Sequence, residues 1–338
     1  MNKMLMTALV LGLGLTLAGY PVGHAEAAQK IKVSCVQPEN DPQTIAMKTV
    51  FKKYVEEKTN GRYEVDVYSG GSLGNFDSVF QGVQFGTIHI ATESTANLSA
   101  FAKQLSLCDM PYLFPSIPAI SYIFEQPVGR KLLSSLESKK VTPLAVIPST
   151  FRIMVSTIPL KKLEDLKNIK FRTTASKSHM NAIAALGPNP TPMPATEMLT
   201  GLQQGVVKAL DQDANSWVAY GCIDVAKYAL VTDHIPVIYI LYCSTRWLDK
   251  LPAEDRAIIL EAVELYRQEA RKMYDAVEEE VFTKSGPERG GIVSYLDDAE
   301  KARWKKQGAS AYDTLSEEDR AVAEEVLKVG EAFMASQK

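Results

Sequence analysis

Two arginines in the middle of the chain, Arg152 and Arg172, have the residue type and the surroundings of an anion site. Arg152 lies in the apolar run PSTFRIMVS and Arg172 in NIKFRTTAS, with strand-forming residues on both sides. A guanidinium among such neighbours is expected to be at least half-buried, and a buried cation needs an anionic partner. Its planar fork of donors matches a carboxylate or a sulfonate, two hydrogen bonds at a time. Two interpretations are open: a structural ion pair with a resident Asp or Glu, which is the commoner role of a buried charge, or a ligand site.

The elements around these arginines predict an α/β unit. The pattern gives strands near 153–155, 169–173 and 206–210, an extended stretch at 191–193, and helices over 176–186 and 196–204. Arg172, Thr173 and Thr174 therefore stand at the end of a strand, just before a helix begins. Ligands of parallel α/β sheets bind at that place, where loops and helix starts supply donors.

The first hundred residues predict a second unit of the same kind. Strands are expected at 31–36, 63–68 and 88–91, with helices over 42–58 and 76–86 between them. Such a βαβαβ order implies a parallel sheet with helices on both faces. After Pro252 a long helical pattern runs to Ala276, and an amphipathic helix is expected over 317–335. The predicted fold class is α/β, with two lobes and a cleft between them that suits a small ligand.

The N-terminus is typical of a secretory signal peptide. Lys3 is followed by an apolar stretch over 4–18 and by small residues around Ala25 to Ala28, so cleavage is expected near Ala27 or Ala28. The alternative is a membrane anchor, but the apolar stretch is too short to span a bilayer comfortably. We therefore expect residues 1–27 to be removed and the protein to be soluble in the periplasm.

Composition limits the classes of function. A formal net charge of −3 and 23% charged residues give no basic surface for nucleic acid. About 310 residues follow the predicted cleavage point, which is enough for two domains. The four cysteines are widely spaced and are expected to be buried thiols, although their pairing cannot be read from the sequence: Cys35, Cys108, Cys222 and Cys243.

No recognisable set of catalytic residues is present. His89, His179 and His234 fit a surface or core role better than catalysis, and the chain has no GxSxG, HExxH, P-loop or GxGxxG motif. Asp211-Gln212-Asp213 could offer oxygens to a metal, but hydrogen bonds around the cleft are at least as good an interpretation. We expect no metal and no cofactor, and a protein that binds a ligand without changing it.

Several longer segments resemble one family of transport proteins. They are GSLGNFDSVFQGVQFGTIHIATES, DMPYLF, LKNIKFRTTAS, ALGPNPTPMPATEMLTGLQQGVV and VAKYALVTDH. Together they resemble the solute-binding subunit of TRAP (tripartite ATP-independent periplasmic) transporters, over roughly residues 30 to 330 and in the family's order. The resemblance implies two α/β lobes, joined by crossing strands and a long helix, that close over a small organic anion. It implies lobe I at 28–149 plus about 239–279, lobe II at 150–238 plus about 280–338, and small and large membrane permease subunits as partners.

The resemblance also assigns roles to particular residues. Arg172 corresponds to the family's arginine that clamps the acid group of the ligand, and Arg152 to a second, frequent arginine. Glu93 matches a position that contacts the ligand from the first lobe. The usual VDGxEN reads VKALDQD here, with Lys208, Ala209 and Leu210 departing from it. The candidate ligand-binding set is Arg172, Arg152, Glu93, Asp211, Gln212, Trp217 and Asn75. Phe151 and Trp217 could equally be pocket wall or ordinary core.

Charge narrows the expected ligand. If the arginines hold one acid group, Glu93 and Asp211 would face the other end and repel a second anion by roughly 1 to 4 kcal/mol. We therefore expect a monoanion with a hydroxyl or amine, such as a hydroxycarboxylate, a sugar acid or an isethionate-type sulfonate. The alternatives are a four-carbon dicarboxylate receptor, an exported enzyme with His89 or His234 as base, and a receptor for a sensor kinase.

Overall fold

The computed structural model describes residues 27–337, so the predicted signal peptide lies almost wholly outside the described residues. The strands are β1 Gln29–Cys35, β2 Tyr63–Tyr68, β3 Ile90–Ser94, β4 Val141–Ser156, β5 Lys170–Thr173, β6 Asn189–Pro192, β7 Ala209–Gln212, β8 Tyr228–Ser244 and β9 Ile292–Tyr295. The α-helices are α1 Pro42–Ala46, α2 Lys52–Lys58, α3 Phe76–Phe85, α4 Thr95–Leu98, α5 Ile117–Glu125, α6 Pro127–Glu137, α7 Lys177–Leu186, α8 Met198–Gln203, α9 Ala214–Ala219, α10 Thr245–Lys250, α11 Ala253–Glu280, α12 Gly286–Glu288, α13 Asp298–Gly308 and α14 Glu317–Ser336.

All these strands belong to one mixed sheet in the order β2-β1-β3-β8-β4-β7-β5-β6, with β9 beside β8. The parallel pairs that the pattern predicts are present: β1 with β2 and β3, and β5 with β6 and β7. Two separate parallel sheets, however, were the wrong expectation. The two parallel sets are joined through β4 and β8, which pair antiparallel with each other and with β7 and β3.

The two joining strands are much longer than the sequence pattern indicated. β4 has 16 residues where a strand was expected only near 153–155, and β8, with 17 residues, was not predicted at all. Bulges interrupt the alternation of β4 between Pro143 and Ile153, where the chain passes from one parallel set to the other. β8 is buried along nearly its whole length, and a continuous apolar run cannot be told from a buried helix by periodicity.

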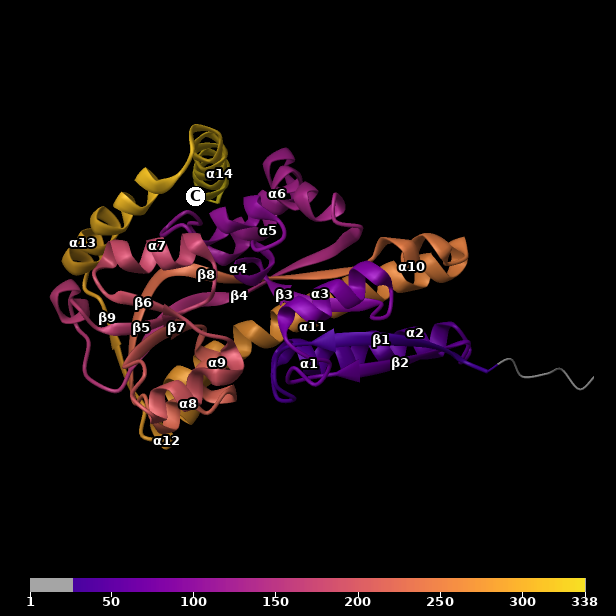
Figure 1. Ribbon diagram of the computed structural model, residues 1–338, viewed down its shortest axis with the longest axis horizontal. Coiled ribbons are helices and arrows are strands. Elements are labelled where there is room, and N and C mark those ends of the chain that lie inside the picture. Colours follow the sequence, from indigo (N-terminus) through magenta and orange to yellow (C-terminus); the bar gives the residue numbers. More distant parts are fainter. Residues whose placement is uncertain (1–26, 338) are drawn as a thin grey trace, which may run out of the picture.

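Helix α11 is the third element that spans the molecule. It runs over Ala253–Glu280, as the long helical pattern predicted, and buries one face that includes Ile259, Val263 and Tyr266. It packs on β4, on α1 beside β1, and on α9 beside β7. Figure 1 shows it as the orange helix that passes from the side of α8 and α9 to the side of α10. The two halves of the sheet are thus tied by two strands and one helix.

Helices cover both faces of the sheet and bury separate cores. Around the β1–β3 half, one cluster includes residues of α3, α5 and α6 and the other residues of α1 and α11. Around the β5–β7 half, α8 and α9 cover one face and α7 and α13 the other. α14, which we expected in lobe II, packs on α5 and α6 of lobe I (Figure 1). The lobe boundaries given above stay a prediction.

Two further observations bear on the earlier expectations. All four cysteines are buried free thiols. Within residues 27–337, no helix is both long enough and apolar enough to cross a membrane.

Candidate functional site

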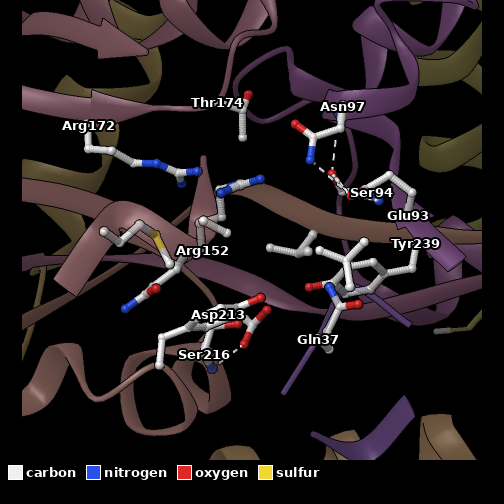
Figure 2. Close-up of a pocket in the computed structure, with 16 residues that line it drawn as sticks. Gln37, Glu93, Ser94, Asn97, Arg152, Arg172, Thr174, Asp213, Ser216 and Tyr239 are labelled. Atoms are coloured by element: carbon white, nitrogen blue, oxygen red, sulfur yellow. Dashed lines mark hydrogen bonds between the residues drawn. The ribbon is translucent and has the colours of Figure 1, made fainter. Parts of the chain in front are cut away.

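A polar chamber of about 60 Å³ lies where the two halves of the sheet meet, at the carboxyl ends of β1, β3, β5 and β7. Strands of both parallel sets end there, so loops from both halves and the crossing strands β4 and β8 supply the wall. The lining residues are Val36, Gln37, Glu93, Ser94, Asn97, Arg152, Arg172, Thr174, Ala195, Met198, Gln212, Asp213, Ser216, Tyr220, Val237 and Tyr239. Figure 2 shows Arg172 and Arg152 pointing into this space.

Arg172 is a buried cation with no ion-pair partner in the described part of the chain. It lies on β5, between β6 and β7, and is 4% exposed. Its Nε donates to the Met193 carbonyl at 2.8 Å, and within residues 27–337 it forms no ion pair. Burial, together with the nearby charge of Arg152, lowers the pKa of Arg172 to about 10. A guanidinium held this way, with its terminal nitrogens toward a chamber, is suited to receive an anion.

Arg152 is in part a structural residue. It stands on β4 between Phe151 and Ile153, where the regular pairing of β4 with β8 is interrupted. One terminal nitrogen lies 3.5 Å from an Asp211 carboxylate oxygen and donates to the Asp211 carbonyl at 3.3 Å. Its Nε is buried and has no partner among the described residues. Arg152 therefore forms a structural ion pair with Asp211, which is one of the two interpretations left open by the sequence. The same side chain also lines the chamber (Figure 2).

Asp211 does not line the chamber, contrary to the expectation that it faces the ligand. It is fully buried and lies behind the wall, where His179 Nε2 donates to its Oδ2 at 2.9 Å and His234 Nε2 at 3.1 Å. The backbone N–H of Thr174 donates to His179 Nδ1 at 3.2 Å, which places the His179 proton on Nε2. Burial acts to raise the pKa of Asp211, but His179, Arg152 and His234 outweigh it and hold that pKa well below its usual range. Asp211 therefore positions Arg152.

Glu93 lies in the chamber wall opposite the arginines, as expected. Its Oε1 accepts from the Ser94 N–H at 2.7 Å, from Ser94 Oγ at 3.1 Å and from Asn97 Nδ2 at 3.0 Å. Its Oε2 is buried and has no partner among residues 27–337. Burial raises the pKa of this carboxyl group, against the three hydrogen bonds that lower it.

The remaining predicted residues divide between the chamber, the cleft and the core. Gln212 lines the chamber, and both atoms of its amide are buried without a partner in the described part of the chain. Trp217, which we expected as a possible wall, is wholly buried in the core of the β5–β7 half, where its Nε1 donates to Ala226 O at 2.8 Å. Asn75 caps α3 by accepting from Ser78 N, and it lines a neighbouring cleft. Phe151 lies outside the chamber wall.

That neighbouring cleft is much larger than the chamber. Its volume is about 920 Å³, and it shares Val36, Glu93, Asn97 and Ala195 with the chamber. The arginines thus line a small chamber that adjoins a larger cleft between the two halves, and a concave space of this kind is where small-molecule sites usually lie.

Sequence reasoning left several residues of the wall out of the ligand-binding set, although it named Asp213 for hydrogen bonds around the cleft. Gln37 follows β1, Asp213 follows β7, and Tyr239 lies on the unpredicted strand β8. Asp213 accepts from Ser216 N at 2.7 Å as the cap of α9, and burial raises the pKa of its carboxyl group. A rule that polar residues at strand ends line such a cleft would have found Gln37 and would have put Asp213 in the ligand-binding set. No sequence signal pointed to Tyr239.

Comparisons with known proteins identify the family of the chain. A model of the family described as bacterial extracellular solute-binding protein, family 7 (DctP), matches residues 33–319. A C4-dicarboxylate-binding periplasmic protein of Rhodobacter capsulatus is 27% identical over 278 residues, covering 82% of this chain and 78% of the relative. The 2,3-diketo-L-gulonate-binding periplasmic protein YiaO of Escherichia coli is 28% identical over 262 residues, covering 75% of this chain and 80% of the relative.

Solved structures give the same result. A TRAP periplasmic solute-binding protein of Haemophilus influenzae, solved with bound L-gulonate, superposes with a TM-score of 0.83 at 25% identity. The match covers 89% of this chain and 99% of that one. The match of most of the chain to the family model, with the same two-lobed architecture, shows that the chain belongs to family 7 of the bacterial extracellular solute-binding proteins, the DctP family of TRAP-transporter receptors.

Proposed function

We propose that this receptor captures a small organic monoanion, with the acid group on Arg172 and Arg152 and a hydroxyl or amine at the opposite wall. TRAP solute-binding proteins bind small organic acids and work with membrane permease subunits. The observation that carries the choice of an anion is Arg172, which is buried beside the chamber with no ion pair in the described residues. A ligand acid group would supply the missing charge.

Charge at the opposite wall supports a monoanion over a dicarboxylate. Glu93 places a carboxyl group on the wall opposite the arginines, and Asp213 places another on the chamber beside Arg152. A second acid group on the ligand would meet these carboxyl groups at a cost of roughly 1 to 4 kcal/mol wherever they are ionised. A hydroxyl or an ammonium group would instead donate to them.

Three ligand types remain within the proposal: hydroxycarboxylates, sugar acids and isethionate-type sulfonates. The names and structures of relatives report 2,3-diketo-L-gulonate, L-gulonate and β-D-galacturonate, which favours sugar acids. A chamber of about 60 Å³ favours a shorter ligand, whereas the adjoining cleft of about 920 Å³ has room for a longer one. A four-carbon dicarboxylate is the alternative that the Rhodobacter capsulatus relative's name supports.

We further propose that the mature receptor works in the periplasm and delivers its ligand to small and large permease subunits driven by an ion gradient. Closure of the two halves over the ligand would remove water from the arginine–acid pair and strengthen it. A receptor for a sensor kinase would use the same binding chemistry with another partner. Uptake measured after deletion of the candidate permease genes separates the two, because only transport depends on the permease.

The positions of the histidines support a receptor over an exported enzyme. His234 is 0% exposed and bound to Asp211, and His89 Nδ1 accepts from the Lys32 N–H at 2.8 Å. Neither residue lines the chamber, so neither is placed to take a proton from a bound acid.

Thermal-shift screening of the purified protein against a panel of organic acids, followed by titration calorimetry, tests the proposal. The panel includes hydroxycarboxylates, hexuronates, aldonates, 2-hydroxyethanesulfonate and four-carbon dicarboxylates. We expect a monoanion with a hydroxyl or amine to bind best and Arg172→Ala to abolish its thermal shift. Preference for a dicarboxylate would overturn the proposed ligand class, and binding that does not depend on Arg172 would overturn the proposed site.

A further inference from the structure

We infer that Asp41 and Asn215 form a latch that joins the two halves of the molecule and favours the arrangement in which the chamber forms between them. Asn215 Nδ2 donates to Asp41 Oδ2 at 2.8 Å, across 174 positions of sequence. Neither residue lines the chamber, so the latch acts on a ligand through the positions of the halves. Its effect on affinity rests on the proposed function, whereas its effect on the halves is measured without a ligand.

The latch connects elements that belong to different halves. Asp41 precedes α1, which packs in the core of the β1–β3 half, and Asn215 lies on α9, which covers the β5–β7 half. Both helices contact the spanning helix α11 (Figure 1). The two side chains are almost fully buried, with 1% of Asp41 and 6% of Asn215 exposed. A hydrogen bond to a carboxylate is stronger than one between neutral groups, so this contact is well placed to hold the halves together.

Asp41 is held firmly on its own side of the contact. Its Oδ1 accepts from the Gln43 N–H at 2.9 Å, as the N-cap of α1, and from the Tyr274 hydroxyl of α11 at 3.1 Å. Gln43 Nε2 donates to the same Tyr274 hydroxyl at 3.0 Å, and Gln43 Oε1 accepts from Thr92 Oγ1 of β3 at 2.6 Å. Contacts from one half and from α11 thus fix the carboxylate, and its Oδ2 accepts from Asn215 of the other half.

The latch lies next to the chamber. Asp213 and Ser216, on either side of Asn215 in the chain, both line it. So does Tyr239, whose ring stacks on that of Tyr274 with the two centroids 6.4 Å apart. A ligand held between walls of both halves therefore requires the same approach of the halves as the latch does. Because both contacts favour one arrangement, loss of the latch lowers the fraction of molecules that can hold a ligand, and the apparent affinity falls by the same factor.

A reciprocal exchange of the two residues separates the latch from a general loss of packing. Asn215→Asp places a second carboxylate against Asp41, and Asn215→Ala removes the donor without adding a charge. Asp41→Asn combined with Asn215→Asp restores one donor and one acceptor at the total charge of the wild type. Asparagine caps a helix as well as aspartate does, and an acidic residue is favourable in the first turn of a helix, so the exchange suits both α1 and α9. Asn168→Asp, at an exposed position, is the matched control for the added charge.

Distances between spin labels, measured by electron spin resonance on the purified protein without ligand, report the positions of the halves. Labels at exposed positions of α2 and α8, introduced by Glu57→Cys and Gln203→Cys, lie in different halves, and the four native cysteines are buried. A buffer at pH 8 keeps the Asp41 carboxyl group, whose pKa is about 7, in its charged form. We expect longer distances in Asn215→Asp than in the wild type or in Asn168→Asp. The exchange variant should return to the wild-type distribution.

Ligand affinity gives the second measurement. Calorimetry with the acid identified by the panel should show about 10-fold weaker binding in Asn215→Asp, within the usual range for coupling between two sites. Asn215→Ala should lie between Asn215→Asp and the wild type. The exchange variant and Asn168→Asp should bind nearly as tightly as the wild type does.

The latch and the proposed function fail in different ways. Equal distances in the wild type and in Asn215→Asp would overturn the latch, whatever the ligand is. Binding that depends on Arg172 but is unchanged in Asn215→Asp would also overturn it and leave the receptor of an organic anion in place. An exchange variant that behaves like Asn215→Asp would rule out the hydrogen bond as the cause. If no acid of the panel binds the wild type, the proposed function fails, and the distances still decide on the latch. Recovery in the exchange variant supports the latch and cannot arise from misfolding.

Discussion

The Arg152 guanidinium in the chamber wall lies 3.5 Å from the Asp211 carboxylate behind it, and both side chains are almost fully buried. Arg172 has no such partner among the described residues. The two arginines that look alike in the sequence thus differ in charge balance: one is neutralised from behind and the other is left positive toward the chamber. This asymmetry lets a monoanion complete the charge of the site.

Replacement of Arg172 by alanine should weaken ligand binding and not weaken the folded protein. Loss of the paired contact should cost about 2 to 5 kcal/mol of binding free energy. The ligand-free protein should keep its free energy of unfolding or gain slightly, because an uncompensated buried cation is removed. Arg172→Lys should also bind poorly, since an ammonium group cannot make the two-pronged contact. Calorimetry and urea unfolding of the same preparations check both effects. Near wild-type affinity in Arg172→Ala would show that the acid group lies elsewhere.

Asp211→Asn should destabilise the protein strongly. It removes the counterion of Arg152 and weakens the acceptor shared by His179 and His234, all of them buried. Breaking a buried pair from one side costs about 3 to 5 kcal/mol. The control is Asp275→Asn, which breaks an exposed pair with Arg271 and should cost less than about 1 kcal/mol. Urea unfolding measures both variants. Equal small costs would mean that the Asp211 network adds little to stability.

Because of the buried Asp41 carboxyl group, the free energy of unfolding should fall as the pH rises from about 4 to about 7. Asp41 connects α1 to α9 by accepting from Asn215 Nδ2 at 2.8 Å, and it also accepts from Tyr274 and from the Gln43 N–H. Burial and the nearby charge of Asp213 raise its pKa to about 7. Between its unfolded pKa of about 4 and this value, the folded state binds more protons, so higher pH favours unfolding.

The effect of Asp41 is isolated by Asp41→Asn. Other buried carboxyl groups, including Asp213 and Glu93, titrate in both proteins, so the difference between the two pH slopes belongs to Asp41 and its coupling to them. We expect the free energy of unfolding of the wild type to fall more steeply from pH 5 to pH 7, by up to about 1.4 kcal/mol per pH unit. Parallel curves for the two proteins would refute a raised pKa at Asp41.

Trp217→Phe should affect stability and leave ligand binding unchanged. The indole is wholly buried, and the substitution removes its hydrogen bond to Ala226 O and part of its volume in the core. A loss of about 1 to 3 kcal/mol of unfolding free energy is expected. Thermal unfolding and calorimetry with the identified ligand check this. Loss of affinity with unchanged stability would instead place Trp217 in contact with the ligand.

Local pattern predicted much of the fold because many elements have a regular period. α7, α3 and α14 lie within a residue or two of their expected bounds. The full length of β4 was not predicted, and β8 was not predicted at all. Bulges, prolines and burial on both faces remove the alternation of polar and apolar residues that marks a strand. The joining of two parallel sets into one mixed sheet depends on those two strands, so the local pattern did not predict it, and only the family resemblance implied crossing strands.

The candidate site was predicted to a similar extent. Arg172, Arg152, Glu93 and Gln212 line the chamber, whereas Asp211 and Trp217 lie behind it. Neighbouring residues of a strand point to opposite faces, so Asp211 and Gln212 cannot both face the ligand. Sequence alone did not say which of the two would do so.

The sequence by itself determined the types of group that are available: two arginines beside strands, acidic and amide residues at strand ends, and family motifs in order. Only the tertiary structure decided which arginine is neutralised, because Asp211 is 59 residues from Arg152 and meets it only when β7 pairs with β4. The positive charge left in the chamber thus depends on the pairing of β7 with β4, and the local sequence around either residue cannot predict a contact between residues 59 positions apart.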